Sequence, residues 1–299
     1  MIIDSHCHLH DKQFYTENQE EVYQRAVAGG TQMIVVGTDE EDSLAAVEFA
    51  ASHDGVWAVV GVHPHDTKEG WGSIRKILED YLPKQAGFRQ DSAMTNSLQA
   101  AELAMLRQSS LGQESATALS GKTDSATDKQ PSKIVGVGEI GLDYHYNNSP
   151  REVQITALEQ QLQWAVDYSL PVSFHVREAY DDFWPVFGNF TGIKGVLHCF
   201  TDTVGTLEKA LALGLYIGVN GISTFTKDPV QQAMFAAVPL ERMLLETDAP
   251  FLTPRPLRGT INEPVNVIEV ARHQAEVKNL PLDTIISTTT ANTRNLFAL

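Results

Sequence analysis

The chain has 299 residues, of which 42% are hydrophobic and 20% are charged, so it is long enough to bury a large core. Its formal net charge of -16 offers no basic surface for wrapping duplex nucleic acid, so such a partner has to be held locally. No apolar run of about 18 residues and no signal-peptide pattern is present, and we expect no membrane contact. Two cysteines, Cys7 and Cys199, cannot form a disulfide framework, which favours a reducing, cytoplasmic location.

Short apolar segments alternate with helical patterns along the chain. Strands are predicted at residues 2–4, 32–36, 56–61, 134–138, 172–174, 195–197, 216–219 and 243–245. Helices are predicted at residues 20–28, 41–53, 72–82, 151–168, 180–187, 204–213, 229–237, 264–278 and 282–296. Eight such units are typical of a TIM (β/α)8 barrel in the α/β class, and an open doubly wound sheet is the alternative.

Residues 85–132 interrupt this alternation. They are rich in Ser, Gln, Ala and Thr, and their second half has few apolar and no aromatic residues. Such a composition buries too little surface to offset the entropy lost on ordering. We therefore predict a single barrel domain, residues 1–299, with a low-complexity insertion between the third helix and the fourth strand. Residues 97–107 could form one amphipathic helix within the insertion.

Histidine and carboxylate residues follow five of the predicted strands, where the chemistry of a TIM barrel takes place. Because an open sheet cannot bring its far edges to one point, their dispersal favours a closed barrel. Each one alone has an ordinary structural explanation, such as an ion-paired Glu or a satisfied core His. Together they are the ligand set of a two-metal hydrolase: His6, His8, Glu139, His175, His198 and Asp248.

The spacing and chemistry of these residues suit divalent cations. His6 and His8 are two apart in an extended segment, so both side chains project to the same side. The two oxygens of Glu139 could bridge cations about 3.5–4 Å apart. Imidazole and carboxylate ligands suit Zn, Mn, Co or Fe and leave Mg for a weaker position. Cys7 and Cys199 each neighbour a candidate ligand, and strand alternation predicts that they point away from it as small buried side chains.

Further residues are candidates for binding a substrate phosphate. His63 and His65 follow the third strand, and Arg177 lies two residues after His175. His63 could donate a hydrogen bond to a phosphate and Arg177 could bind it through two N–H groups, although a loop salt bridge explains Arg177 equally well. The mouth of the barrel could also be lined by Asn220, Thr224, Arg258, Asn262 and Glu263.

The segments DSHCHL, GVHPHD, VGEIGLDYH, PVSFHVREA, GVLHCFTD, YIGVNGI and LLETDAPFLTP resemble the TatD family of metal-dependent hydrolases and deoxyribonucleases. The resemblance covers nearly the whole chain except residues 85–132. It implies a TIM barrel, one metal on His6, His8, Glu139 and Asp248, and a second on Glu139, His175 and His198. It also implies exonuclease activity on DNA, often from the 3′ end. The chain departs from the family pattern in its insertion, in HVRE where HSR is common, and in HCFTD where HCFSG is common.

The expected reaction is in-line attack of a metal-activated water on a phosphodiester, with Asp248 accepting the proton. Two alternatives stay open. One is hydrolysis of an ester or amide, such as an aminoacyl ester on tRNA, since the same centre can polarise a carbonyl. The other is a metal-binding protein without catalysis, which the complete set of ligands disfavours. We expect DNA ends or another phosphodiester or ester as the partner, with no obligate protein partner.

Overall fold

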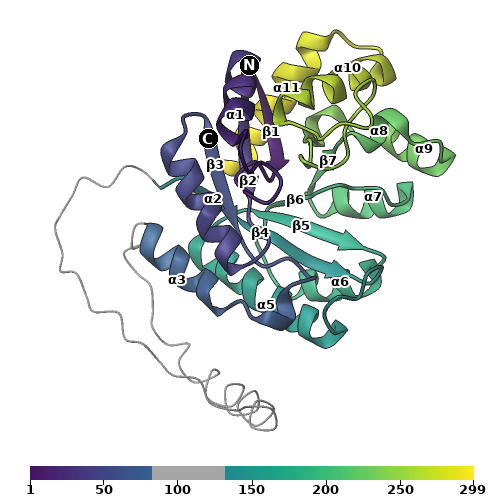
Figure 1. Ribbon diagram of the computed structural model, residues 1–299. Helices are drawn as coiled ribbons and strands as arrows, with labels where there is room; N and C mark the ends of the chain where they lie inside the picture. Colours follow the sequence, from purple (N-terminus) through teal and green to yellow (C-terminus); the bar gives the residue numbers. More distant parts are fainter. Residues whose placement is uncertain (83–131) are drawn as a thin grey trace, which may run out of the picture. The chain divides into compact units, whose positions relative to one another are not determined.

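Parallel strands form the sheet in the computed structural model, which describes residues 1–82 and 132–299. Within these ranges each strand pairs with the next one along the chain, in the order β1 to β8 (Figure 1). The strands are β1 (Ile2–Cys7), β2 (Thr31–Val36), β3 (Val56–Val60), β4 (Ile134–Asp143), β5 (Val172–Arg177), β6 (Gly195–Leu197), β7 (Tyr216–Val219) and β8 (Met243–Leu245).

The barrel is nearly closed, because two hydrogen bonds connect the end of its first strand to the segment that follows its last strand. The N–H of Asp248 donates to the carbonyl of His6 (2.9 Å), and the N–H of His8 donates to the carbonyl of Ala249 (2.8 Å). These bonds join the segment after β8 to the end of β1, and the C-terminal helix α11 (Leu282–Phe297), yellow in Figure 1, also packs against β1. The predicted TIM (β/α)8 barrel is confirmed.

The helices lie within a residue or two of their predicted positions, except that the helix predicted at 264–278 begins three residues later, at Val267, after a 3-10 turn at Pro264–Asn266. They are α1 (Gln19–Ala28), α2 (Glu40–Ser52), α3 (Gly72–Tyr81), α5 (Arg151–Tyr168), α6 (Tyr180–Gly188), α7 (Val204–Ala212), α9 (Pro229–Ala237), α10 (Val267–Lys278) and α11. The one-turn helix α8 (Ile222–Phe225) was not predicted, because four residues are too few to show a helical period. Short 3-10 turns are present at Thr67–Glu69, Leu240–Arg242 and Pro264–Asn266.

The described residues form one compact unit. The predicted insertion at residues 85–132 falls between α3 and β4, and residues 83–131, including the helix expected at 97–107, lie outside the described ranges. The organisation as a single domain with an insertion therefore stays a prediction. No helix among the described residues is long and apolar enough to cross a membrane.

Three strands extend further than predicted. The predicted ends were residues 4, 138 and 174, so His6, Glu139 and His175 were expected just beyond their strands, but they lie inside β1, β4 and β5. The prediction was wrong because it ended each strand where the apolar run ends. In the barrel these polar side chains have polar partners, and the strands continue past them. In β4 the register against β5 shifts between Val137 and Ile140, around Glu139.

The strands are buried on both faces, as expected for a parallel sheet covered by helices. In β2, Met33 and Val35 belong to the large cluster that includes apolar helix residues. The alternating residues Ile34 and Val36 belong to a smaller cluster of strand side chains that also contains Leu296 and Phe297 of α11. This alternation separates the filling of the barrel from the packing of the surrounding helices.

Candidate metal centre

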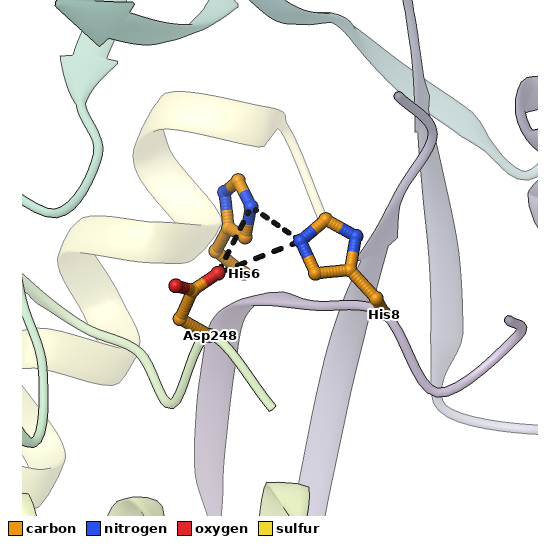
Figure 2. Close-up of side chains that lie close together, drawn as sticks. All are labelled: His6, His8 and Asp248. Atoms are coloured by element: carbon orange, nitrogen blue, oxygen red, sulfur yellow. Dashed lines mark hydrogen bonds and ion pairs between the residues drawn. The ribbon is translucent and has the colours of Figure 1, made fainter. Parts of the chain in front are cut away.

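Two histidines of the first strand meet an aspartate that follows the last strand. His6 lies in β1, His8 directly follows that strand, and Asp248 lies three residues beyond the end of β8 (Figure 2). The Nε2 atoms of His6 and His8 are 3.3 Å apart, and Asp248 Oδ1 lies 3.9 Å and 3.4 Å from them, respectively. The lone pairs of imidazole nitrogens and a carboxylate oxygen repel one another at these distances unless a proton or a cation lies between them. The three residues therefore fit a metal site.

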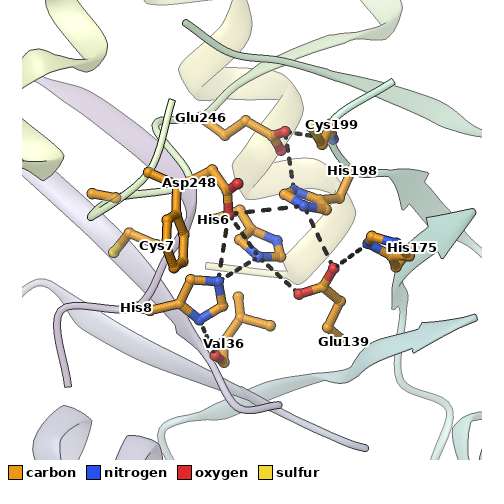
Figure 3. A network of polar contacts seen from close by, with 12 residues as sticks. His6, Cys7, His8, Val36, Glu139, His175, His198, Cys199, Glu246 and Asp248 are labelled. Carbon is orange, nitrogen blue, oxygen red and sulfur yellow. Dashed lines mark hydrogen bonds and ion pairs between the residues drawn. The ribbon is translucent and has the colours of Figure 1, made fainter. Parts of the chain in front are cut away.

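Glu139 connects this group to a second one. Its Oε2 lies 3.3 Å from His6 Nε2, while its Oε1 lies 2.8 Å from His175 Nδ1 and 3.5 Å from His198 Nε2 (Figure 3). The carboxylate is almost completely buried, with 3% of the residue exposed. The two oxygens thus face different histidines, which is the arrangement that a bridging ligand requires. The structure brings together all six residues predicted as ligands.

His63 lies deeper in the site than expected. Its Nε2 is 3.6 Å from Glu139 Oε1, and it forms a potential metal-binding group with Glu139 and His175. Arg177 lies elsewhere, at the exposed end of β5, with its guanidinium carbon 4.8 Å from the ring centroid of Tyr146. The substrate-binding roles of both residues stay predictions.

Two buried carboxylates behind the histidines were missed by the sequence reasoning. Glu246 is fully buried, and its Oε1 lies 3.1 Å from His198 Nδ1 and accepts the N–H of Cys199 (2.6 Å). Gly218 on β7 makes room for it, since a Cβ there would lie 2.4 Å from Glu246 Oε2. Asp143, the last residue of β4, has Oδ2 3.0 Å from His175 Nε2.

These contacts orient the histidines for metal binding. His8 Nδ1–H donates to the carbonyl of Val36 (2.8 Å), which leaves Nε2 to face Asp248. A metal-binding histidine in proteins typically donates its other N–H to a carboxylate or a carbonyl. His175 has such a carboxylate in Asp143, Glu246 lies 3.1 Å from His198 Nδ1 as its ion-pair partner, and the oxygen of Ser173 lies 3.3 Å from His6 Nδ1. The donor set and its surroundings therefore fit divalent cations.

The charges in the site are strongly coupled. Burial alone would raise the pKa of Glu139, but the imidazoles of His198 and His63 hold it well below its usual value, and the pKa of Asp248 is lowered in the same way. Burial alone would lower the pKa of His8 and His198, yet the neighbouring carboxylates raise these values to about 9 and about 10. Ionised carboxylate and neutral imidazole are the metal-binding forms, so metal binding would release protons from these histidines.

Comparison with known proteins places the chain in a family. A family model described as "TatD related DNase" matches residues 3–298. The chain belongs to this family. Its relatives include the uncharacterized metal-dependent hydrolase YabD of Bacillus subtilis, 30% identical, and the 3'-5' ssDNA/RNA exonuclease TatD of Erwinia amylovora, 31% identical, each aligned over 100% of both chains. Among solved structures, YJJV, a TatD homolog from Escherichia coli k12, superposes with a TM-score of 0.72 at 28% identity, covering 100% of this chain and 98% of that one.

The match to the TatD-related family confirms the resemblance found in the sequence, and the chain is a metal-dependent hydrolase by family. One departure from the family pattern has a local explanation. In HCFTD, Asp202 Oδ1 accepts hydrogen bonds from the hydroxyl of Thr206 (2.6 Å) and the N–H of Thr203 (2.7 Å) at the start of α7. The Asp202 side chain therefore stabilises the start of α7. An effect of the departure on substrate preference stays a prediction.

The two cysteines differ from each other. Cys7 is fully buried and its thiol faces the carbonyl of Ile34 (3.6 Å), as predicted. For Cys199 the prediction was wrong, since its sulfur lies within 4.8 Å of potential ligand atoms of His198 and Asp248. Strand alternation does not apply to it, because β6 ends at Leu197 and Cys199 has a left-handed backbone with φ 48°.

Proposed function

We propose that the protein removes nucleotides from the ends of single-stranded DNA or RNA by hydrolysing phosphodiester bonds, with two divalent cations of Zn, Mn or Mg. The observation that carries this proposal is the position of Glu139, whose two oxygens face two separate groups of histidines. The names of the relatives add the substrate class, since the Erwinia amylovora protein is a 3'-5' ssDNA/RNA exonuclease.

The proposed ligands divide between the two cations. The first would be held by His6, His8, Asp248 and one oxygen of Glu139. The second would be held by the other oxygen of Glu139 with His175 and His198, and His63 lies within reach of the same position. Bound there, the cations would polarise the scissile phosphate and lower the pKa of a coordinated water.

We propose that Asp248 accepts the proton of the attacking water. One of its oxygens faces His6 and His8, while Figure 2 shows the other pointing away from both rings. Its lowered pKa keeps the carboxylate ionised at neutral pH, as a proton acceptor requires. Arg177 at the exposed end of β5 would contact a phosphate of the strand outside the metal centre.

The net charge of the whole chain favours a substrate that is held at its end. The net charge of -16 disfavours wrapping of a duplex, so binding has to rely on the metal centre and local contacts. The hydrolysis of esters or amides has no comparable support among the named relatives. The cytoplasmic location expected from the two unpaired cysteines is part of the same proposal.

The test is hydrolysis of end-labelled strands by the metal-loaded protein. Single-stranded DNA and RNA labelled at the 5′ end should shorten progressively, and EDTA should abolish the reaction. An aminoacyl ester offered under the same conditions should remain intact. Hydrolysis of the ester without cleavage of either strand would overturn the proposal in favour of the ester alternative.

A further inference from the structure

Two half-exposed phenylalanines lie beside the metal centre. Phe14, before α1, is 44% exposed and Phe251, after β8, is 46% exposed. Their ring centroids are 5.1 Å apart with an interplanar angle of 78°. The N–H of Phe251 donates to the carbonyl of Asp248 (2.8 Å), which makes these two residues the ends of a β-turn with Cα atoms within about 7 Å. The aromatic pair is therefore attached to the turn that carries a proposed metal ligand.

The backbone beneath the pair is fixed by the buried Asn262. The side chain of Asn262 donates to the carbonyls of Phe251 (2.7 Å) and Thr247 (3.0 Å). The buried hydroxyl of Tyr15, the neighbour of Phe14, donates to the carbonyl of Asn262 (2.7 Å). Asn262 was expected to line the mouth of the barrel, but it is fully buried and instead holds both segments. Exposed aromatic rings on such a fixed backbone are suited to binding.

We propose that Phe14 and Phe251 form a stacking platform for a base of the substrate strand next to the scissile phosphate. This inference rests on the proposed function. A chain with net charge -16 gains little from general attraction of phosphates, so a sequence-independent grip has to come from elsewhere. Stacking on aromatic rings provides it, because every base has a π-face.

Other observations favour a base over a protein partner. The platform belongs to the segment that carries Asp248, and a strand whose phosphate reaches the metal centre has to place its neighbouring bases close to it. The same loop also exposes Leu257 (38%) and Ile261 (61%), which a second copy of the chain could cover. Association with a second copy of the chain is therefore the competing explanation for this exposed surface. The experiment distinguishes it from base stacking.

The first part of the experiment measures binding by the metal-loaded protein to strands with hydrolysis-resistant phosphorothioate linkages, so that the metal centre is intact and no strand is cleaved. Fluorescence anisotropy compares a labelled single-stranded oligonucleotide with a fully abasic strand of the same length. Phe251→Ala should raise the Kd for the normal strand roughly 5- to 150-fold, the range of one lost stacking contact, and leave the Kd for the abasic strand unchanged. Phe251→Tyr should bind like wild type, and Phe14→Ala should show a smaller loss in the same direction. Tyr81→Ala, which removes a 41% exposed ring on α3, is the matched control and should have no effect.

The second part measures cleavage of the normal strand with ordinary phosphodiester linkages, and the oligomeric state by light scattering. If wild type cleaves the strand but Phe251→Ala binds and cleaves it equally well, the platform is refuted and the proposed function stands. If wild type cleaves no nucleic acid yet Phe251→Ala weakens only the binding of the normal strand, the platform stands and the proposed function fails. An oligomer that dissociates in Phe251→Ala with unchanged strand binding would assign the surface to a second copy and overturn the platform.

Discussion

Replacing Glu246 by Gln should weaken metal binding without removing a ligand. Glu246 Oε1 lies 3.1 Å from His198 Nδ1 and accepts the N–H of Cys199. Gln has the same size and keeps an acceptor oxygen, but it lacks the negative charge that increases the basicity of His198. Mutation of a residue that contacts a metal-binding histidine typically lowers metal affinity 10- to 100-fold, which corresponds to about 1.4 to 2.7 kcal/mol. We expect the upper part of this range, because Glu246 is fully buried and its charge is poorly screened.

Isothermal titration calorimetry of the metal-free protein with Mn²⁺ measures this effect directly. Glu20→Gln is the matched control, since Glu20 Oε2 lies the same 3.1 Å from His53 Nε2, but its side chain is 65% exposed. The control should bind metal like wild type. The reasoning would be refuted if Glu246→Gln, melting at the wild-type temperature, bound metal within about twofold of wild type.

Further predictions concern proton transfer, the dependence of metal affinity and stability on pH, and the insertion. Asp248→Asn keeps one oxygen but cannot accept a proton, so steady-state kinetics should show kcat lowered at least about a hundredfold with a smaller change in KM, and a normal kcat would exclude Asp248 as the base. Calorimetric metal affinity should increase with pH until His8 and His198 have lost their protons, near their pKa values of about 9 and about 10, and a flat profile would contradict this. The melting temperature of the metal-free protein should show the opposite trend and fall as the pH rises. The raised pKa values of His8 and His198 contribute stability that is fully present below about 6.5, the ordinary histidine pKa, and is lost as the pH rises through about 9 to 10. Joining Lys84 to Lys133 through a short Gly/Ser linker should leave kcat/KM within about threefold, because this connection enters β4 at the end opposite the ligand loops, and a tenfold loss in a folded, metal-binding variant would contradict that.

The sequence predicted the barrel because each buried strand is a short apolar run followed by a helical pattern. It also predicted which His and carboxylate side chains lie together, since these residues follow the apolar runs at five places that only a closed barrel brings to one point, while their role as metal ligands stays a prediction. The strand ends were less predictable. His6, Glu139 and His175 continue their strands, and an apolar period cannot distinguish a polar residue inside a barrel from one in a loop.

The residues behind the ligands could not be predicted from pattern alone. Glu246 and His198 directly follow β8 and β6, and they come together only when β6, β7 and β8 lie side by side. The available signal was a second acidic residue beside a predicted ligand, as in LETD, but the same signal also describes many surface carboxylates. His63 and Asn262 show the same limitation, because their chemistry was recognised while their burial was not.

The central claim is that Glu139 bridges two cations, and metal content tests it most directly. Mass spectrometric metal analysis of the gel-filtered protein should find two ions per chain in wild type. Glu139→Ala removes an oxygen from both groups, so the folded variant should lose both ions together. A Glu139→Ala protein that retained two tightly bound ions would contradict the account.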